Sequence, residues 1–148
     1  MISCNAGWAL SAPVLLTLAV CLGVAFLSAW VNRQRHFPGQ RSFFLLHLGT
    51  LWWMAAAALE MASQGPQCKM FWASMAWPGI LAVPTFWAVF LWQYVNSERR
   101  PISLRQVGGL TLVPVLVWLL ALSNPWHWLF YDAASAPISA EVGAPIDY

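Results

Sequence analysis

Six of the seven basic residues in this chain lie in two short clusters, and each cluster separates two long apolar runs. The clusters are Arg33, Arg35 and Arg41, and Arg99, Arg100 and Arg105. An apolar run of roughly 20 residues is long enough to cross a bilayer as a helix. Basic loops between such helices stay on the cytoplasmic side. The two clusters therefore predict both the number of spans and their orientation.

The apolar runs predict four membrane-spanning helices, at about residues 12–31, 42–61, 70–94 and 107–122. The expected fold class is all-α integral membrane, with residues 1–131 forming one four-helix transmembrane domain. With both basic clusters inside, the N-terminus, the 63–69 loop and the C-terminus are all outside. Lys69 is then the only basic residue outside. Residues 132–148 form an external tail rich in Ala, Pro and Ser.

The composition excludes several function classes. The chain is 60% hydrophobic and 8% charged, whereas a soluble domain carries about 25% charged residues. The net charge of +2 is small and topology explains the arginines, so we expect the lipid bilayer as a partner and no nucleic acid. No nucleophile motif, metal-protease motif, carboxylate pair or phosphate loop is present. We expect no enzyme, and nothing in the sequence requires a cofactor.

Two of the three cysteines, Cys4 and Cys68, fall on the predicted external side. Disulfides persist in oxidising compartments, so a bond between them would tie the N-terminal segment to the second loop. The alternative is two unpaired thiols, and the sequence does not decide between them. Cys21 lies within the first apolar run, where a thiol is usually a small packing residue.

Ionisable residues at membrane depth are costly and are therefore candidates for function. His47 near the start of the second span is a candidate pigment or haem ligand, or a proton-relay group. The alternative is a neutral imidazole bonded to a neighbouring helix. No second intramembrane His is present to complete a bis-His metal site, so no metal site is predicted.

The second span also carries two tryptophans and a carboxylate. Trp52 and Trp53 lie near the bilayer middle, where an indole N–H needs a partner. They either line a cavity or pack against other helices. Glu60 follows a run of four alanines that lets another helix approach closely. It either receives a ligand or pairs with Lys69 near the interface.

Prolines in the third span and a histidine after the fourth complete the set of unusual residues. Pro78 and Pro84 free carbonyls on the preceding turn and would bend the third helix. A bent helix either opens a pocket or is a purely structural kink. His127 lies between two tryptophans outside the membrane, and a lone His indicates no metal site.

Four short segments with these residues resemble the N-terminal seven-helix sensor region of bacterial histidine kinases and diguanylate cyclases. They are Arg-His-Phe-Pro-Gly at 35–39, Leu-Trp-Trp-Met-Ala at 51–55 with Leu-Glu at 59–60, Val-Pro-Thr-Phe-Trp at 83–87 with Phe90 and Gln-Tyr at 93–94, and Ser-Asn-Pro-Trp-His-Trp-Leu-Phe at 123–130. The resemblance covers roughly residues 30–131. Each segment is weak alone, and their order, spacing and shared topology make the combination specific.

The resemblance implies a membrane-embedded ligand-binding domain of a bacterial signal-transduction protein in the cytoplasmic (inner) membrane. It implies a pocket at the external ends of helices two to four, with Trp53, Glu60, Pro84 and His127 as the ligand-binding residues. Seven helices in that family lead to a cytoplasmic kinase or cyclase, whereas four leave the C-terminus outside. We therefore expect this chain to lack its output module and to work with further transmembrane helices, partner subunits or a second copy as a homodimer.

The competing hypothesis is a small four-helix structural subunit of a respiratory or photosynthetic membrane complex. Abundant tryptophan, few charges and the absence of a catalytic set suit that role, with His47 as a pigment ligand. The sequence does not identify the ligand under either hypothesis.

Overall fold

The computed structural model describes residues 7–34, 36–96, 103–127 and 129–130. These residues form four long helices: α1 (Ala12–Asn32), α2 (Gln40–Ala62), α3 (Pro66–Val95) and α4 (Leu104–Leu122). A single turn, α5 (Asn124–His127), follows α4. All four long helices are long and apolar enough to cross a membrane. The all-α class and the four membrane-length helices predicted from the sequence are confirmed.

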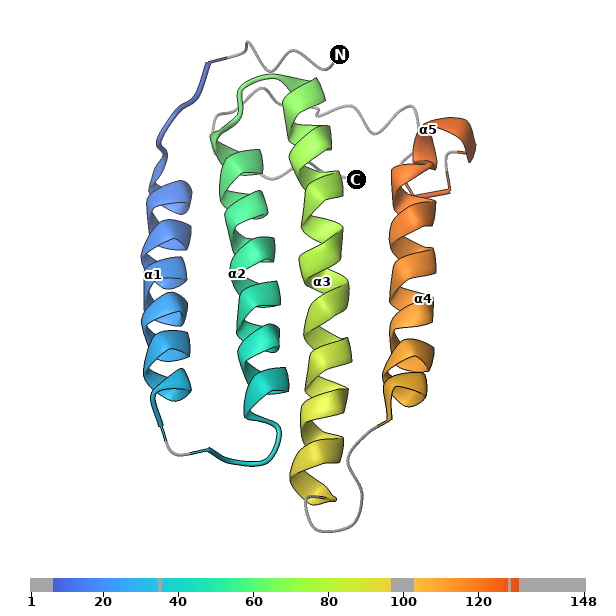
Figure 1. The fold of residues 1–148 in the computed structure, drawn as a ribbon. Helices are drawn as coiled ribbons and strands as arrows, with labels where there is room; N and C mark the ends of the chain where they lie inside the picture. The colour runs from blue at the N-terminus through green and yellow to red at the C-terminus, as the bar shows by residue number, and fades with distance from the viewer. Residues whose placement is uncertain (1–6, 35, 97–102, 128, 131–148) are drawn as a thin grey trace.

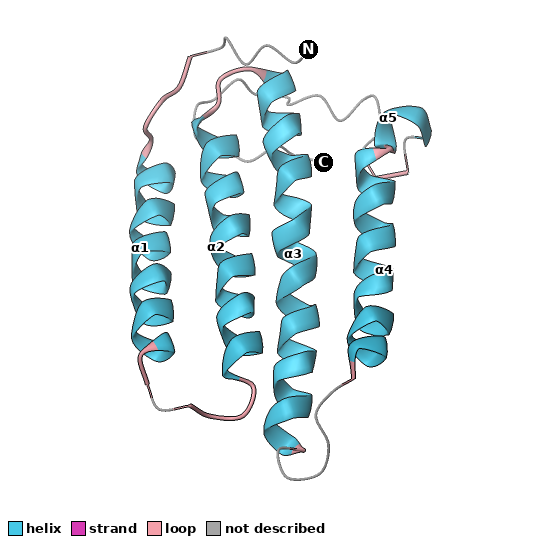
Figure 2. Cartoon of the chain, in the orientation of Figure 1, coloured by secondary structure: helices cyan, strands magenta, loops and turns pink. Residues whose placement is uncertain are grey.

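The four helices lie side by side in chain order as one open row (Figure 1). The chief contacts join α1 to α2, α2 to α3, and α3 to α4. Figure 2 shows the short described loop that joins α2 to α3. The end of α1 and the starts of α2 and α4 lie at one end of the row (Figure 1), and the start of α3 lies at the other. Arg33, Arg41 and Arg105 belong to the first of these ends, which we call the arginine end, and Lys69 belongs to the opposite lysine end.

Local sequence signals set the helix starts. Pro66 opens α3, because the missing proline N–H is not needed in the first helical turn. Lys69, expected in the loop, therefore lies in the first turns of α3, where it is 3% exposed. At the start of α4, the Ser103 hydroxyl accepts from the Gln106 amide and the Gln106 side chain accepts from the Ser103 amide. This capping box begins α4 three residues earlier than the apolar run suggests.

The α2–α3 pair has the closest packing in the row. A Cβ atom built at Gly79 would lie 2.6 Å from the Gly49 carbonyl oxygen and 2.6 Å from the Trp53 backbone nitrogen. One built at Gly49 would lie 3.0 Å from Ala82 Cβ. Only glycine lets the two backbones approach this closely, and such contacts allow weak Cα–H···O bonds. Gly49 and Gly79 therefore set the separation of α2 and α3.

Small residues continue this close packing along both helices. Buried positions on α2 include Ser42, Gly49 and Ala56, which recur every seven residues. On α3, the small residues Ala73, Ala76 and Gly79 are buried at three-residue intervals. Lipid tails are as apolar as Leu, so helix association in a bilayer depends on van der Waals contact between small side chains. This row of small residues explains why α2 and α3 form a tight pair.

Hydrogen bonds reinforce the pair at two levels. The Trp52 indole Nε1 donates to the Met75 carbonyl oxygen of α3 at 2.7 Å. That bond lies one residue from the Ser74 carbonyl, which loses its amide partner because Pro78 has no N–H. Nearer the arginine end, the buried Ser42 hydroxyl donates to Gln93 Oε1 at 2.7 Å. The partner that the sequence required for the Trp52 indole is thus a backbone group of α3.

At the lysine end, the segment before α1 pairs with the α2–α3 loop. The Ala9 amide donates to the Ala62 carbonyl at 3.0 Å, and the Gln64 amide donates to the Gly7 carbonyl at 3.2 Å. These bonds form an isolated antiparallel bridge between Trp8 and Ser63. The N-terminal segment is thereby held against the turn that joins the tight pair.

The glycine contact predicts opposite effects for two Gly→Ala substitutions. Gly79→Ala inserts a methyl group against backbone atoms and should cost about 1–3 kcal/mol, as overpacking does. Gly108→Ala on α4 meets nothing within 4 Å and should be neutral or slightly stabilising, because Ala favours helix. Thermal unfolding in detergent, followed by circular dichroism, measures both. Equal midpoints for the two variants would contradict the assignment of Gly79 to the helix contact.

Candidate functional site

The structure places Trp53 and Pro84 at different levels of the tight pair. The backbone nitrogen of Trp53 abuts Gly79 at the α2–α3 crossing, and its side chain is 43% exposed. Pro84 lies five residues further along α3, and its side chain is exposed. Neither residue lines the cavities described below. Their role in ligand binding stays a prediction.

His127 forms the cap that follows α4. Its Nε2 lies 3.0 Å from the Leu120 carbonyl and 2.9 Å from the Ser123 hydroxyl, and its Nδ1 accepts from the Leu129 amide at 3.1 Å. The buried Asn124 acts similarly, because its Oδ1 accepts from the Phe130 amide at 2.7 Å. Both ring nitrogens of His127 are thus engaged in ending α4, and a ligand would have to displace one of these bonds.

Glu60 and Lys69 lie near the lysine end, half-buried and buried respectively, and each has an interaction partner. Cys68, beside Lys69, is buried and disulfide-bonded. Cys21 on α1 is a free thiol. Cys4 lies outside the described residues, so its pairing with Cys68 stays a prediction.

His47 belongs to an aromatic cluster between α2 and α3 toward the arginine end. Its Nδ1 lies 2.8 Å from the Phe43 carbonyl, and its ring meets the Phe43 ring edge to face at 4.5 Å. Phe43 in turn contacts Phe90 at 5.1 Å, and Phe90 contacts Tyr94 at 5.7 Å. The Nδ1 proton is used within α2, which leaves Nε2 as the available nitrogen. No group of three metal-ligating side chains occurs among the residues that the structure describes.

The loop before α2 is held by residues of the Arg-His-Phe-Pro-Gly segment and its neighbour. Gly39 has φ of 83°, and a Cβ there would lie 2.8 Å from the Phe90 ring. Gln40 is 7% exposed, and its Nε2 donates to the Val31 carbonyl at 3.2 Å, at the end of α1. Its Oε1 lies 2.8 Å from His36 Nδ1. This segment therefore joins α1, α2 and α3 at the arginine end.

Two cavities of the described chain lie between α3 and α4, where the contact is much looser than between α2 and α3. A central cavity of about 190 Å³ is lined by five residues of α3 and four of α4. They are Pro78, Leu81, Ala82, Thr85 and Phe86, with Thr111, Pro114, Val115 and Trp118. The lining is almost wholly apolar, which is typical of a small-molecule site.

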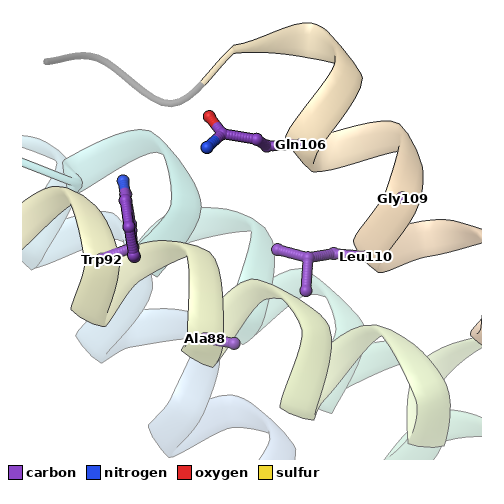
Figure 3. A pocket seen from close by; sticks show the side chains of 5 residues that line it. All are labelled: Ala88, Trp92, Gln106, Gly109 and Leu110. Carbon is purple, nitrogen blue, oxygen red and sulfur yellow. The ribbon is translucent and has the colours of Figure 1, made fainter.

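A second cavity of about 420 Å³ lies nearer the arginine end. Figure 3 shows Gln106 and Leu110 reaching from α4 toward the space above Trp92 and Ala88 of α3. Gly109 adds to the opening, since it has no side chain. Both cavities lie between the same two helices, and we refer to them together as the α3–α4 cleft.

Polar groups in the central cavity differ in whether they have partners. The Thr85 hydroxyl donates to the Leu81 carbonyl at 2.8 Å, and the Thr111 hydroxyl donates to the Val107 carbonyl at 3.1 Å. The Trp118 indole Nε1 is buried and has no hydrogen-bond partner among the described residues. An unpaired buried donor costs about 1–3 kcal/mol. Trp118 is thus the one cavity-lining side chain whose donor is unsatisfied in the described chain.

Reasoning from the sequence missed the residues of α4 that line this cleft. Pro114 and Trp118 are a proline and a tryptophan within the fourth apolar run, the same signals that drew attention to Pro78 and Trp53. A search of all four apolar runs for proline and tryptophan would have found Pro114 and Trp118. The looseness of the α3–α4 contact has no comparable sequence signal.

Comparison with known families finds one family whose match extends over most of the chain. A family described as the N-terminal 7TM region of histidine kinase matches residues 13–145, a stretch that includes all four long helices. The chain belongs to this family. No curated protein and no solved structure is significantly similar to it. Membership supports a membrane sensory domain, which is not itself catalytic, and gives no support to the structural-subunit alternative.

The cysteine arrangement predicts a simple count of reactive thiols in this sensor region. In denatured, unreduced protein, a polyethylene-glycol maleimide should add once, at Cys21, and after reduction three times. Cys4→Ser should raise the unreduced count to two, because it frees Cys68. Gel mobility reports each addition. Three additions before reduction would show that no disulfide forms.

Proposed function

We propose that this chain is the membrane-embedded sensory domain of a bacterial signal-transduction protein in the inner membrane. Family membership carries the proposal. The kinase or cyclase reaction belongs to a separate output part, which the domain reaches through further transmembrane helices, partner subunits or a second copy. The domain supplies ligand binding and a conformational change.

The proposed orientation has the arginine end in the cytoplasm and both termini outside. Arg33, Arg41 and Arg105 gather at that end of the row, and Lys69 is at the other. Basic residues close to membrane helices are retained on the cytoplasmic side, which supports this orientation. The disulfide at Cys68 then lies on the oxidising side.

We place the proposed ligand site in the α3–α4 cleft, in preference to a pocket of Trp53, Glu60, Pro84 and His127. The cleft supports ligand entry because it is open, apolar and lined by two proline-bearing helices. A ligand that binds one α3–α4 arrangement better than another shifts the population between them. Because α2 and α3 are locked at Gly49 and Gly79, α4 moves relative to that pair.

The orientation predicts the activity of reporter fusions. Alkaline phosphatase fused after Gln64 should be active and after Gln34 inactive, and β-galactosidase should show the reverse. The reason is that alkaline phosphatase needs an oxidising compartment for its disulfides. Enzyme assays of cells producing matched amounts of each fusion measure this. Active phosphatase after Gln34 would place the arginine end outside.

The sensory role predicts that filling the cleft changes signalling. Val115 lines the central cavity, so Val115→Phe should hold α3 and α4 in one arrangement and shift response-regulator phosphorylation several-fold. Val113→Phe is the matched control, because Val113 lies on the same helix, is partly exposed as Val115 is (63% and 46%), and lines neither cavity. Phosphate-affinity electrophoresis of the source bacterium's response regulators reads the effect. Unchanged phosphorylation with Val115→Phe at normal protein levels would contradict the sensory role of the cleft.

A further inference from the structure

We propose that the central cavity binds a small apolar molecule with one hydrogen-bond acceptor, held by the indole N–H of Trp118. This inference rests on the proposed function, because it names the ligand class for the α3–α4 cleft. Three observations carry it: the size of the cavity, its lining, and the state of its polar groups.

Size limits the ligand to little more than one ring. The central cavity measures about 190 Å³, somewhat more than the roughly 150 Å³ apolar cavity that holds benzene. A ring with a short substituent therefore fills the cavity, whereas a longer molecule would leave part of its length outside it. The cavity is not enclosed, so a molecule of this size can enter it from the membrane.

The lining selects an uncharged molecule. Pro78, Leu81, Phe86 and Pro114 supply apolar surface, and no charged residue is among the described residues that line the cavity. An ion would lose its hydration without gaining a counter-charge, which is costly at this depth. The ligand is therefore neutral and mainly apolar.

The polar groups select an acceptor. Both threonine hydroxyls of the cavity already donate to helix carbonyls, at Leu81 and Val107. The Trp118 Nε1 is buried without a partner among the described residues, and an indole nitrogen can donate but not accept. Because this nitrogen has almost no accessible surface, the ligand reaches it only after a rotation of the indole ring toward the cavity, and a carbonyl, ether or hydroxyl oxygen would then satisfy it. A ligand with only donor groups would not.

The structure contains an internal comparison. Trp72 Nε1 on α3 is also buried and without a described partner, but Trp72 lines neither cavity. The two indoles therefore share burial and an unpaired donor and differ in access to a cavity. A ligand in the central cavity should affect Trp118 and leave Trp72 unchanged.

Nuclear magnetic resonance of the full chain in lipid nanodiscs, labelled with ¹⁵N at the tryptophan indoles, tests the proposal. Trp118→Phe and Trp72→Phe each remove one indole signal and so assign the two peaks. The probes are acetophenone and α-methylstyrene, which are nearly equal in size and differ in whether the ring substituent carries a carbonyl oxygen or a methylene group. Acetophenone should move the Trp118 signal downfield with saturation, and α-methylstyrene should bind about fivefold to tenfold more weakly, since it lacks the acceptor.

Three results would overturn the proposal. Equal affinity for both probes would show that the indole selects no acceptor. Equal movement of the Trp118 and Trp72 signals would show probe partitioning into lipid only. A Trp118 signal that neither probe moves would show that the site is closed or filled by water.

Variants separate this inference from the sensory role. Val115→Phe should abolish the saturable shift, and Val113→Phe should preserve it. If acetophenone fails to bind but Val115→Phe still alters phosphorylation in cells, the ligand class is wrong and the sensory role stands. If acetophenone binds but Val115→Phe leaves phosphorylation unchanged, the site exists and the sensory role of the cleft fails.

Discussion

The backbone contact between Gly49 of α2 and Gly79 of α3 is the constraint on which the rest of the molecule depends. In a bilayer no hydrophobic effect drives helices together, so close packing and interhelical hydrogen bonds hold them. The contact brings Trp52 within 2.7 Å of the Met75 carbonyl and sets Ser42 against Gln93. It also defines α3 as a fixed wall, against which α4 packs loosely.

This asymmetry gives α3 two different faces. One face, rich in small residues, is joined to α2 with no room for a side chain at the crossing. The other carries Pro78, Thr85 and Phe86 and borders a cavity shared with α4. A tightly packed pair beside a loosely packed neighbour is an arrangement in which a ligand of modest size can shift a population, because it acts on the weaker of two interfaces. At the lysine end of α4, the hydrogen bonds of His127 and Asn124 fix the point at which that helix ends.

The arginine clusters and the lengths of the apolar runs were enough to predict four helices and the class of the fold. Helix starts at Pro66 and Ser103 were readable only with capping rules, which the apolar pattern alone ignores. The motif residues Gly39, Gln40, Asn124 and His127 were noticed or lay beside noticed segments, yet their work as caps and joints needs the folded geometry. The α3–α4 cleft was not predictable. How closely α4 packs against α3 depends on how the side chains of the two helices fit together, and no local sequence pattern shows that.

The central claim is that α2 and α3 move as one body and that α4 moves against them. Double electron–electron resonance tests it most directly, with spin labels in a Cys21→Ala background on Leu45→Cys/Leu91→Cys and on Leu91→Cys/Leu112→Cys. All three labelled side chains are at least 40% exposed. The α3 label is common to both pairs, so its own motion contributes to both distance distributions. The account predicts a narrow α2–α3 distance distribution and a broad or divided α3–α4 distribution. Equally narrow distributions for both pairs would contradict it.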